Sequence, residues 1–501
     1  MRWLPGAVFF AYLVGTVLLF YFGPWHYPVR HHDRLLTFLV AAHAAFALGY
    51  ATGVRGTPRA SRWRVDPRVL ALLCIAVDLA LLFPTSHHNT GSWIPPIWDA
   101  LENPGQAYRE TLRLQHEKVP YVNYVRMLLA PLLASALPLG IFYWRSLGRW
   151  GRIALVTLVV GTLGMFVSMG TNRGVGEWAT LFPWFVCAGH VSGVLPLDRR
   201  SGTAAAIIGV ANFAVLFLFF GATMYTREGA AARAGRLASI GAVSEIVAAR
   251  PQPNPPAAQA PAPVKQAPAP VKQAPAPVKQ APTPVKQAPT PAKQAPTPAK
   301  QVPAPAEQRP TPAERRQGPQ ESAIKPAIVN PALVTVAGLT SYFTQGYYAV
   351  YLSLDEPFVP MWGIGHSLFL QRQAARLTGN SAILERSYPE RIEAKGWNAA
   401  RSWATIYPWI ASDVGFPGTV VVVFLIGYLL GSVWVDALGG KNPWAVALLG
   451  QILLMLYFFP ANNRCLSTGE GVVAFGVLLP LWWLSRRGVS QPAKEHDQLV
   501  G

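Results

Sequence analysis

The chain has 501 residues, of which 51% are hydrophobic and only 13% are charged, and it carries 17 tryptophans. Its 43 Lys and Arg residues against 24 Asp and Glu residues give a formal net charge of +19. A water-soluble domain uses about a quarter of its residues for charge, so this composition argues against a soluble nucleic-acid-binding protein despite the excess of positive charge. Three cysteines in this length exclude a disulfide framework. The composition indicates a polytopic membrane protein.

Apolar stretches of roughly 16–24 residues recur along the chain, and about 20 helical residues cross the hydrocarbon core of a bilayer. They predict an all-α polytopic membrane protein with ten spans, of which the first is an uncleaved anchor. The third stretch is short and carries Asp78, which we expect to pair with a buried group such as His43 or His190. The predicted spans are residues 4–23, 35–53, 69–84, 121–144, 151–170, 178–197, 203–222, 414–435, 443–460 and 471–484.

Arginines in the short loops set the expected orientation, because cytoplasmic loops carry an excess of Lys and Arg. The loops after the second, fourth and sixth spans and the segment after the tenth all fall on one side if both termini are cytoplasmic. Their arginines are Arg55, Arg59, Arg62, Arg64, Arg68, Arg145, Arg149, Arg152, Arg199, Arg200, Arg486 and Arg487. The segments expected on the outer side are residues 24–34, 85–120, 171–177, 223–413 and 461–470.

The long outer segment separates two predicted transmembrane bundles. Seven helices fall within residues 1–222 and three within residues 414–485, and residues 486–501 form a cytoplasmic tail. Residues 331–413, just before the second bundle, are rich in aromatic side chains and hold six basic and six acidic groups, which predicts a folded element at the membrane surface. Residues 331–354 are uncharged, but inserting them as a further span would reverse every later loop. We therefore expect an interfacial or re-entrant segment there.

Residues 223–330 are rich in Pro, Ala, Lys and Gln, and repeats such as KQAPAPV and KQAPTPA fill residues 265–306. Two prolines per repeat remove helix donors and the repeats have no apolar seam, so they predict an extended, disordered linker rather than a coiled coil. Three roles stay open for it: a tether across the periplasm, a basic comb that attracts anionic glycan, and a repeat expansion of little consequence.

Several familiar catalytic motifs are missing from the sequence. It contains no glycine-rich nucleotide-binding loop, no HExxH, no Cys/His cluster with zinc spacing and no GxSxG. ATP-driven transport, zinc hydrolysis and serine hydrolysis therefore have no sequence support.

Arginines on the expected outer side are the main candidates for a binding site. Each of them alone can extend toward lipid headgroups, but Arg126 lies inside a predicted span, where a charge is costly and usually functional. Several guanidinium groups on one side suit a diphosphate ligand, because each can bind phosphate oxygens through two parallel hydrogen bonds. The candidates for diphosphate or substrate binding are Arg126, Arg173, Arg372, Arg376 and Arg464.

Two further residues are candidates for acid–base chemistry. Asp413 lies where the eighth span begins, so it either caps that helix or serves as a general base or orienting group for a sugar hydroxyl. His366, in GIGHS, is an eligible base, because an imidazole can gain or lose a proton near neutral pH, although a structural role is also open.

Three stretches resemble bacterial oligosaccharide repeat-unit polymerases of the O-antigen (Wzy) type. They are LTSYFTQGYYAVYLSL, GIGHSLFL and WATIYPWIASDVGFPGTVVVVFLIGYLLGSVW, and they lie within residues 339–436. The turn that carries Arg173 and the overall layout are similar as well. The proline-rich tract is not part of the usual pattern of that family.

The resemblance implies a glycosyltransferase-C-like helical fold and an inverting, metal-independent glycosyl transfer without a cofactor, at the outer face of the bacterial inner membrane. The implied partners are an undecaprenyl-diphosphate-linked oligosaccharide donor, a second one as acceptor, and a chain-length regulator; the product would be an O-antigen, capsule or exopolysaccharide. By the resemblance, Arg173, Arg372 and Arg376 hold the diphosphate leaving group, and His366 or Asp413 positions or deprotonates the acceptor hydroxyl.

Two other functions stay open. An O-antigen ligase would use the same donor on the same side of the membrane, and the sequence does not separate it from a polymerase. A glycolipid transporter or flippase is expected to show paired half-sequences and interrupted helices. The two halves show no similarity, and charges within the predicted spans are nearly limited to Asp78 and Arg126.

Overall fold

The computed structural model describes residues 1–25, 27–117, 121–227, 331–397 and 403–486, and every regular element in these ranges is helical. The predicted all-helical class is therefore confirmed for the described residues. The heptapeptide repeats, almost all of the predicted linker and the tail after Arg486 lie outside these ranges.

Long apolar helices make this a membrane-embedded protein. Six helices of the described ranges are long and apolar enough to cross a bilayer. They are α1 (Leu4–Phe22), α2 (His32–Gly53), α3 (Pro67–Thr90), α8 (Gly148–Ser168, preceded by the 3-10 turn η1, Trp144–Leu147), α10 (Arg199–Arg227) and α15 (Ile406–Leu438). The stretch around Asp78, short in sequence, is thus part of a helix of full spanning length.

The remaining predicted spans differ from the expectation. The fourth is broken into α6 (Tyr121–Leu128) and α7 (Ala130–Phe142), which are bent by 61° and count as a seventh span if taken together. α16 (Pro443–Phe458) and α18 (Gly469–Ser485) have 16 and 17 residues. At ~1.5 Å per residue these two helices are shorter than the ~30 Å hydrocarbon core. α9 (Arg173–Val191) has 19 residues, but two of its first five, Arg173 and Glu177, are charged. It is not among the helices that are long and apolar enough to cross a bilayer. By length and composition the described chain shows six or seven spans, fewer than the ten predicted.

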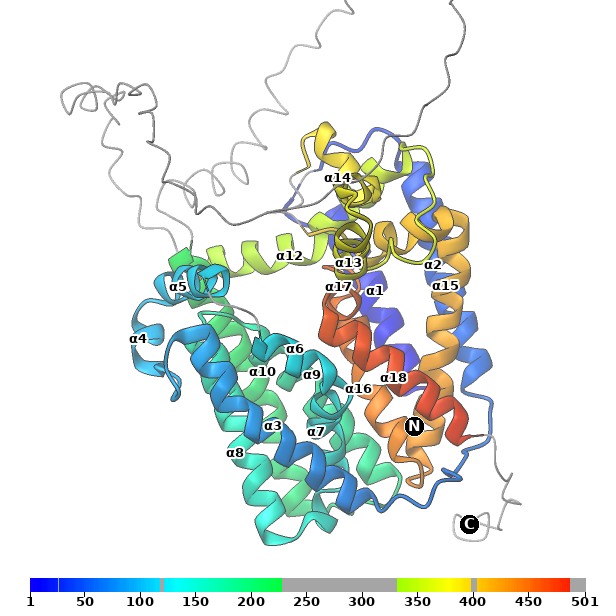
Figure 1. Cartoon of the computed structure of the whole chain (residues 1–501). Helices are drawn as coiled ribbons and strands as arrows, with labels where there is room; N and C mark the ends of the chain where they lie inside the picture. Colours follow the sequence, from blue (N-terminus) through cyan, green and yellow to red (C-terminus); the bar gives the residue numbers. More distant parts are fainter. Residues whose placement is uncertain (26, 118–120, 228–330, 398–402, 487–501) are drawn as a thin grey trace, which may run out of the picture. The chain divides into compact units, whose positions relative to one another are not determined.

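The remaining elements connect these helices, and several of them gather at one end of the bundle (Figure 1). They are α4 (Ile97–Glu102), α5 (Pro104–Glu117), α12 (Pro331–Leu354), α13 (Leu368–Thr378), η3 (Ser381–Arg386), α14 (Tyr388–Arg391), η4 (Ile392–Lys395) and α17 (Arg464–Ser467). We call the end that carries α12, α13 and α14 the α13 end. There α12, the predicted interfacial or re-entrant segment, forms one helix that lies crosswise to α1 and α15 in Figure 1 and packs against α1, α10 and α15.

Glycines bring the backbones of α2 and α15 into direct contact. A Cβ atom added at Gly49 would overlap the backbone carbonyl oxygen of Phe424 on α15. One added at Gly427 would in turn overlap the backbone carbonyl oxygen of Phe46 on α2. Gly53 and Gly431, each four residues further on, face the other backbone in the same way. Small residues spaced by four allow helices in a membrane to approach closely, and this pair forms the most extensive helix–helix contact of the described chain.

A carboxylate buried at the opposite end joins three parts of the chain. Asp436, near the end of α15, accepts hydrogen bonds from the backbone N–H of Arg59 (3.0 Å) and from the Trp482 indole (2.9 Å), and the Arg486 Nε atom lies 2.8 Å from its Oδ2. Asp436 is only 1% exposed. It therefore ties the segment after α2 and the end of α18 to α15. Two of the arginine-bearing segments that were expected on one side meet at this carboxylate.

Replacing Gly427 with Ala should separate α2 from α15, because the new methyl group has no room beside the backbone of Phe46. Overpacking of this kind costs about 1–3 kcal/mol, so we expect a clearly lower thermal unfolding midpoint for the detergent-solubilised protein. Gly15→Ala on α1 is the control, because nothing lies within 4 Å of its added Cβ. Equal midpoints for the two variants would contradict the proposed role of the glycine contact.

Asp436→Asn should destabilise the protein much more than a matched surface change. The asparagine amide is neutral, so the Arg486 charge would lose its carboxylate partner. The amide N–H group would also face the hydrogen-bond donors that now donate to Asp436. Breaking a buried ion pair costs about 3–5 kcal/mol. The control is Asp355→Asn, whose ion pair with Arg34 is exposed. Thermal unfolding of both variants in detergent measures the difference, and a similar small shift in both would refute it.

Candidate anion-binding site

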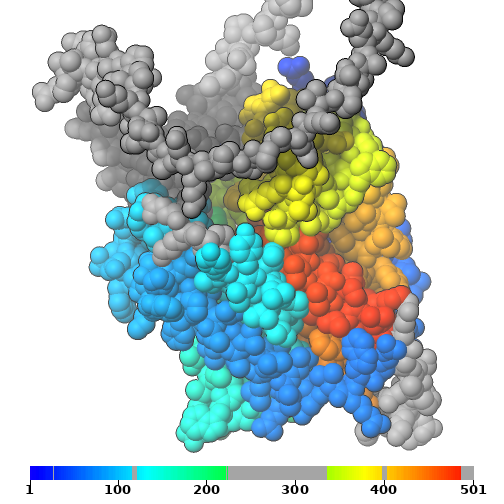
Figure 2. Space-filling model, viewed as in Figure 1, coloured from blue at the N-terminus to red at the C-terminus, as the bar shows by residue number. Residues whose placement is uncertain are grey.

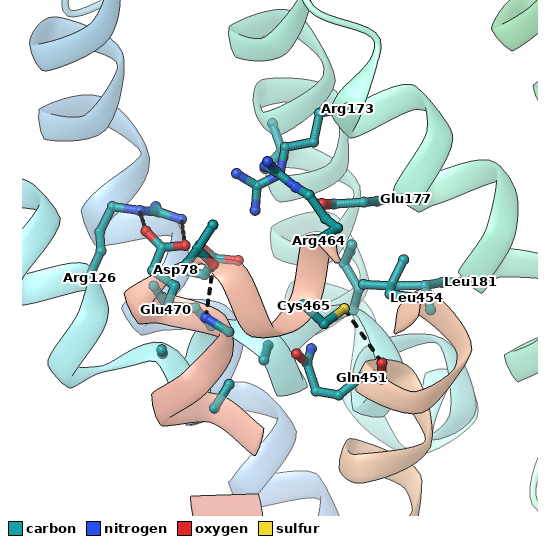
Figure 3. A pocket seen from close by; sticks show the side chains of 18 of the residues that line it. Asp78, Arg126, Arg173, Glu177, Leu181, Gln451, Leu454, Arg464, Cys465 and Glu470 are labelled. Atoms are coloured by element: carbon teal, nitrogen blue, oxygen red, sulfur yellow. Dashed lines mark hydrogen bonds and ion pairs between the residues drawn. The ribbon is translucent and has the colours of Figure 1, made fainter. Parts of the chain in front are cut away.

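A cavity of about 140 Å³ lies among the helices that converge below the α13 end, and Figure 3 shows it from close by. Most of its ionisable lining comes from segments that are far apart in the sequence. The charged lining residues are Asp78 on α3, Arg126 on α6, Arg173 and Glu177 on α9, Arg464 on α17 and Glu470 on α18. Three of the five predicted arginines therefore meet in one cavity.

The rest of the cavity lining is mostly apolar. α7 contributes Leu133 and Leu137, α9 contributes Leu181, and α16 contributes Leu454. Charged groups and hydrocarbon thus line the same small space. A ligand that matches both surfaces has an anionic or polar head joined directly to an apolar chain.

Arg126 is held by two neighbours. Its Nε and Nη2 atoms lie 2.8 Å and 3.4 Å from the two carboxylate oxygens of Glu470, and its Nη1 donates to the Thr85 hydroxyl at 3.2 Å. The bend between α6 and α7 directs this short helix across the end of the bundle, so that Arg126 reaches the cavity. This paired geometry neutralises the arginine that the sequence places inside a span.

Arg173 is held less firmly. It is the first residue of α9, and its Nε donates to Glu177 Oε1 at 2.7 Å, one turn later on the same helix. Its guanidinium also lies 5.3 Å from the centre of the Phe166 ring. The other N–H groups of Arg173 form no hydrogen bond with the described residues, and they point into the cavity in Figure 3.

Arg464 stands opposite Arg173 with no countercharge in contact. Its guanidinium lies beside that of Arg173 in Figure 3 and forms neither a hydrogen bond nor an ion pair with any residue that the structure describes. The nearby Arg173 charge, followed by burial, lowers the pKa of Arg464 to about 10. Two adjacent guanidinium groups repel each other, and an anion placed between them removes that repulsion. The arrangement therefore has the character of an anion-binding site.

Asp78 also differs from the expectation. His43 hydrogen-bonds to the Tyr407 hydroxyl, and His190 Nδ1 accepts from the backbone N–H of Leu197, so neither histidine pairs with Asp78. The expected pairing was wrong, because the α3 side chain turns instead toward the arginines of the cavity.

His366 and Asp413 form a hydrogen-bonded pair near the cavity. Asp413 accepts from the backbone N–H groups of Gly363, Gly365 and His366 at 2.7–2.8 Å, and its Oδ2 lies 2.9 Å from His366 Nδ1. Asp413 does not cap α15: that role belongs to Thr405. The carboxylate lies two residues before Gly415, whose φ of 70° breaks the helix and is readily adopted by glycine. Asp413 therefore organises the 363–366 loop and orients the His366 ring.

The loop with His366 packs on the turn that carries Arg464. Asn463, directly before Arg464, donates a hydrogen bond to the His366 carbonyl oxygen, and α13 packs against α17 and α18. In Figure 2 the yellow surface around α13 borders the red surface of α17 and α18. The backbone of the predicted base thus contacts the residue that precedes Arg464, although His366 is not among the described residues that line the cavity.

Arg372 and Arg376 lie elsewhere. Both are exposed on α13, and neither is among the described residues that line the cavity. The five predicted arginines therefore divide into three that share a cavity and two on the surface of the α13 end.

The carboxylates of the cavity were not among the predicted site residues. The i, i+4 spacing of Arg173 and Glu177 on one helix is a sequence pattern that indicates their pairing. No comparable pattern links Arg126 to Glu470, because 344 residues separate them.

Comparison of the chain with protein-family models, with curated proteins and with solved structures found no match. The family resemblance, and the activity that it implies, therefore stay predictions.

Asp413→Asn should loosen the loop that it organises. The amide nitrogen cannot accept the hydrogen bonds that one of the carboxylate oxygens now receives, so the amides of Gly363, Gly365 and His366 should exchange with solvent at least about tenfold faster. Hydrogen exchange followed by mass spectrometry of residues 360–367 measures this, with Asp355→Asn as the control. Unchanged exchange in the Asp413 variant would show that the loop is held by other contacts.

Proposed function

We propose that this protein is a membrane glycosyltransferase that polymerises lipid-diphosphate-linked oligosaccharide repeat units at the outer face of the bacterial inner membrane. The observation that carries the proposal is the Arg464 guanidinium, which faces Arg173 and has no countercharge in contact among the described residues, in a cavity whose uncharged lining is mostly apolar. A diphosphate that joins a sugar to a polyprenyl chain has both the negative charge and the apolar neighbour that this cavity suits.

The two facing arginines would act on the leaving group. As the bond between the sugar and the diphosphate breaks, negative charge grows on the departing phosphate oxygen. Guanidinium groups already in position stabilise that charge more in the transition state than in the bound substrate, which is the condition for catalysis. Cations of the protein thus supply the stabilisation that a metal ion supplies in many phosphate-releasing enzymes, and the proposed reaction needs no cofactor.

His366 is the proposed base. Because its Nδ1 is engaged by Asp413, its Nε2 is left to take the proton of the acceptor hydroxyl. Asp413, whose oxygens accept three backbone hydrogen bonds besides the histidine contact, serves as the orienting group. The acceptor oxygen would attack the sugar carbon from the side opposite the diphosphate, which inverts the configuration at that carbon.

The proposal assigns the α13 end to the outer side, as the arginine-rich loops predict. Ten spans result if α9, α16 and α18 also cross the membrane. The donor and the acceptor are each lipid-linked, and Arg372 and Arg376, exposed on α13, are available to a headgroup at the membrane surface. A chain-length regulator is the further partner that the resemblance implies.

The test is polymer formation from purified lipid-linked repeat units by the full chain in lipid vesicles. Wild-type protein should give a ladder of products, and Arg464→Ala should reduce polymer by about 100-fold or more, because one donor to a developing anion is worth that much. Arg34→Ala is the control, since Arg34 forms an exposed ion pair and does not line the cavity.

A full ladder from the Arg464 variant would refute the proposed role of the cavity. A single transfer of a finished glycan to a different lipid, with no ladder, would identify the protein as a ligase.

A further inference from the structure

The charges that line the cavity balance one another. Three guanidinium groups (Arg126, Arg173 and Arg464) face three carboxylates (Asp78, Glu177 and Glu470). A diphosphate would therefore bring its negative charge into a site with no net positive charge. In a poorly solvated space the added negative charges would repel the carboxylates strongly. One carboxylate must therefore move away from the arginines for the ligand to bind tightly.

The three carboxylates differ in how firmly they are held and in whether their movement would free an arginine. Glu470 is engaged through both oxygens by Arg126. Asp78 forms no hydrogen bond or ion pair with any residue that the structure describes, so its movement would free no guanidinium. Glu177 is held to Arg173 by one hydrogen bond from Nε, between side chains that are 20% and 36% exposed.

Glu177 also lies where the ligand charge is expected. Its carboxylate is beside the facing guanidinium groups of Arg173 and Arg464 in Figure 3, and its charge acts on both of them. A phosphate oxygen bound between these two arginines would compete with Glu177 for the Arg173 Nε–H group. The flexible glutamate side chain can turn away, whereas the arginine stays at the start of α9.

We propose that Glu177 is an internal anion that occupies Arg173 before the ligand binds and is displaced by the ligand. This inference rests on the proposed binding of a diphosphate in the cavity. Displacement exchanges one hydrogen bond of Arg173, from a carboxylate oxygen to a phosphate oxygen. Return of Glu177 after glycosyl transfer favours release of the lipid diphosphate product. Glu177 is thus a positioning residue that sets the affinity of the site.

The experiment measures binding of inorganic pyrophosphate, as the probe, to the full chain in lipid nanodiscs by calorimetry. Glu177→Gln keeps the size of the side chain and removes its charge, so we expect it to bind pyrophosphate about fivefold more tightly, the upper end of what a partly exposed ion pair contributes. A carboxylate that merely held Arg173 in place would give the opposite result, weaker binding. Thermal unfolding of each variant verifies that it folds.

Two matched variants test whether Glu177 competes with the ligand for Arg173 or only adds negative charge to the cavity. Asp78→Asn removes one negative charge from the same cavity without touching Arg173, so its gain in affinity should be clearly smaller. In an Arg173→Ala background, Glu177→Gln should no longer tighten binding, because the group for which it competes is gone.

Unchanged or weaker binding by Glu177→Gln, an equal gain from Asp78→Asn, or a gain that persists without Arg173 would each overturn the inference while leaving the anion site in place. A wild-type protein that binds no pyrophosphate would remove the anion site, and with it both the inference and the proposed diphosphate role.

Discussion

The close approach of α2 and α15 determines where the C-terminal part of the chain lies. Four glycines let the two backbones touch, so α15 is docked against a helix that precedes it by more than three hundred residues. The position of α15 determines where the helices after it lie. α16 packs against α7 and α9, and Arg464 on α17 and Glu470 on α18 line the cavity. At the other end of α15, Asp436 binds the backbone of Arg59 and the side chain of Arg486. The cavity exists because these contacts hold distant segments together.

Burying a charged side chain inside a membrane protein costs free energy unless a partner compensates the charge. The three arginines of the cavity are compensated to different degrees. Arg126 is satisfied by Glu470 and Thr85, and Arg173 is satisfied in part by Glu177. Arg464 has no such contact with any residue that the structure describes, and it lies beside another arginine. A structural network would pair this last cation as well, because an unpaired buried charge destabilises a fold. This uneven pairing is the property expected of an anion-binding site, and it supports the proposed role of the cavity.

The His366 loop depends on the same frame. Gly415 interrupts α15 just after Asp413, and this break lets the carboxylate collect the backbone N–H groups of the 363–366 loop. Asn463 then connects the loop to the turn of Arg464. The sequence offered His366 and Asp413 as separate candidates, and it left Asp413 open between a helix cap and a base or orienting group, because the apolar run begins directly after it. The helix begins earlier, at Ile406, where Ile406, Tyr407 and Ile410 are buried in the core.

The sequence by itself determined the helical membrane class, the positions of most long helices and the arginines most worth attention, because apolar runs and isolated charges are local properties of the chain. It predicted ten spans, and α16 and α18 form helices of only 16 and 17 residues, so the full count is not confirmed. It paired Asp78 with the wrong partners and did not select Glu177 or Glu470. Only the tertiary structure decided that Arg126, Arg173 and Arg464 share a cavity while Arg372 and Arg376 do not. These choices depend on contacts between residues hundreds of positions apart, which follow from how helices pack and not from any local pattern.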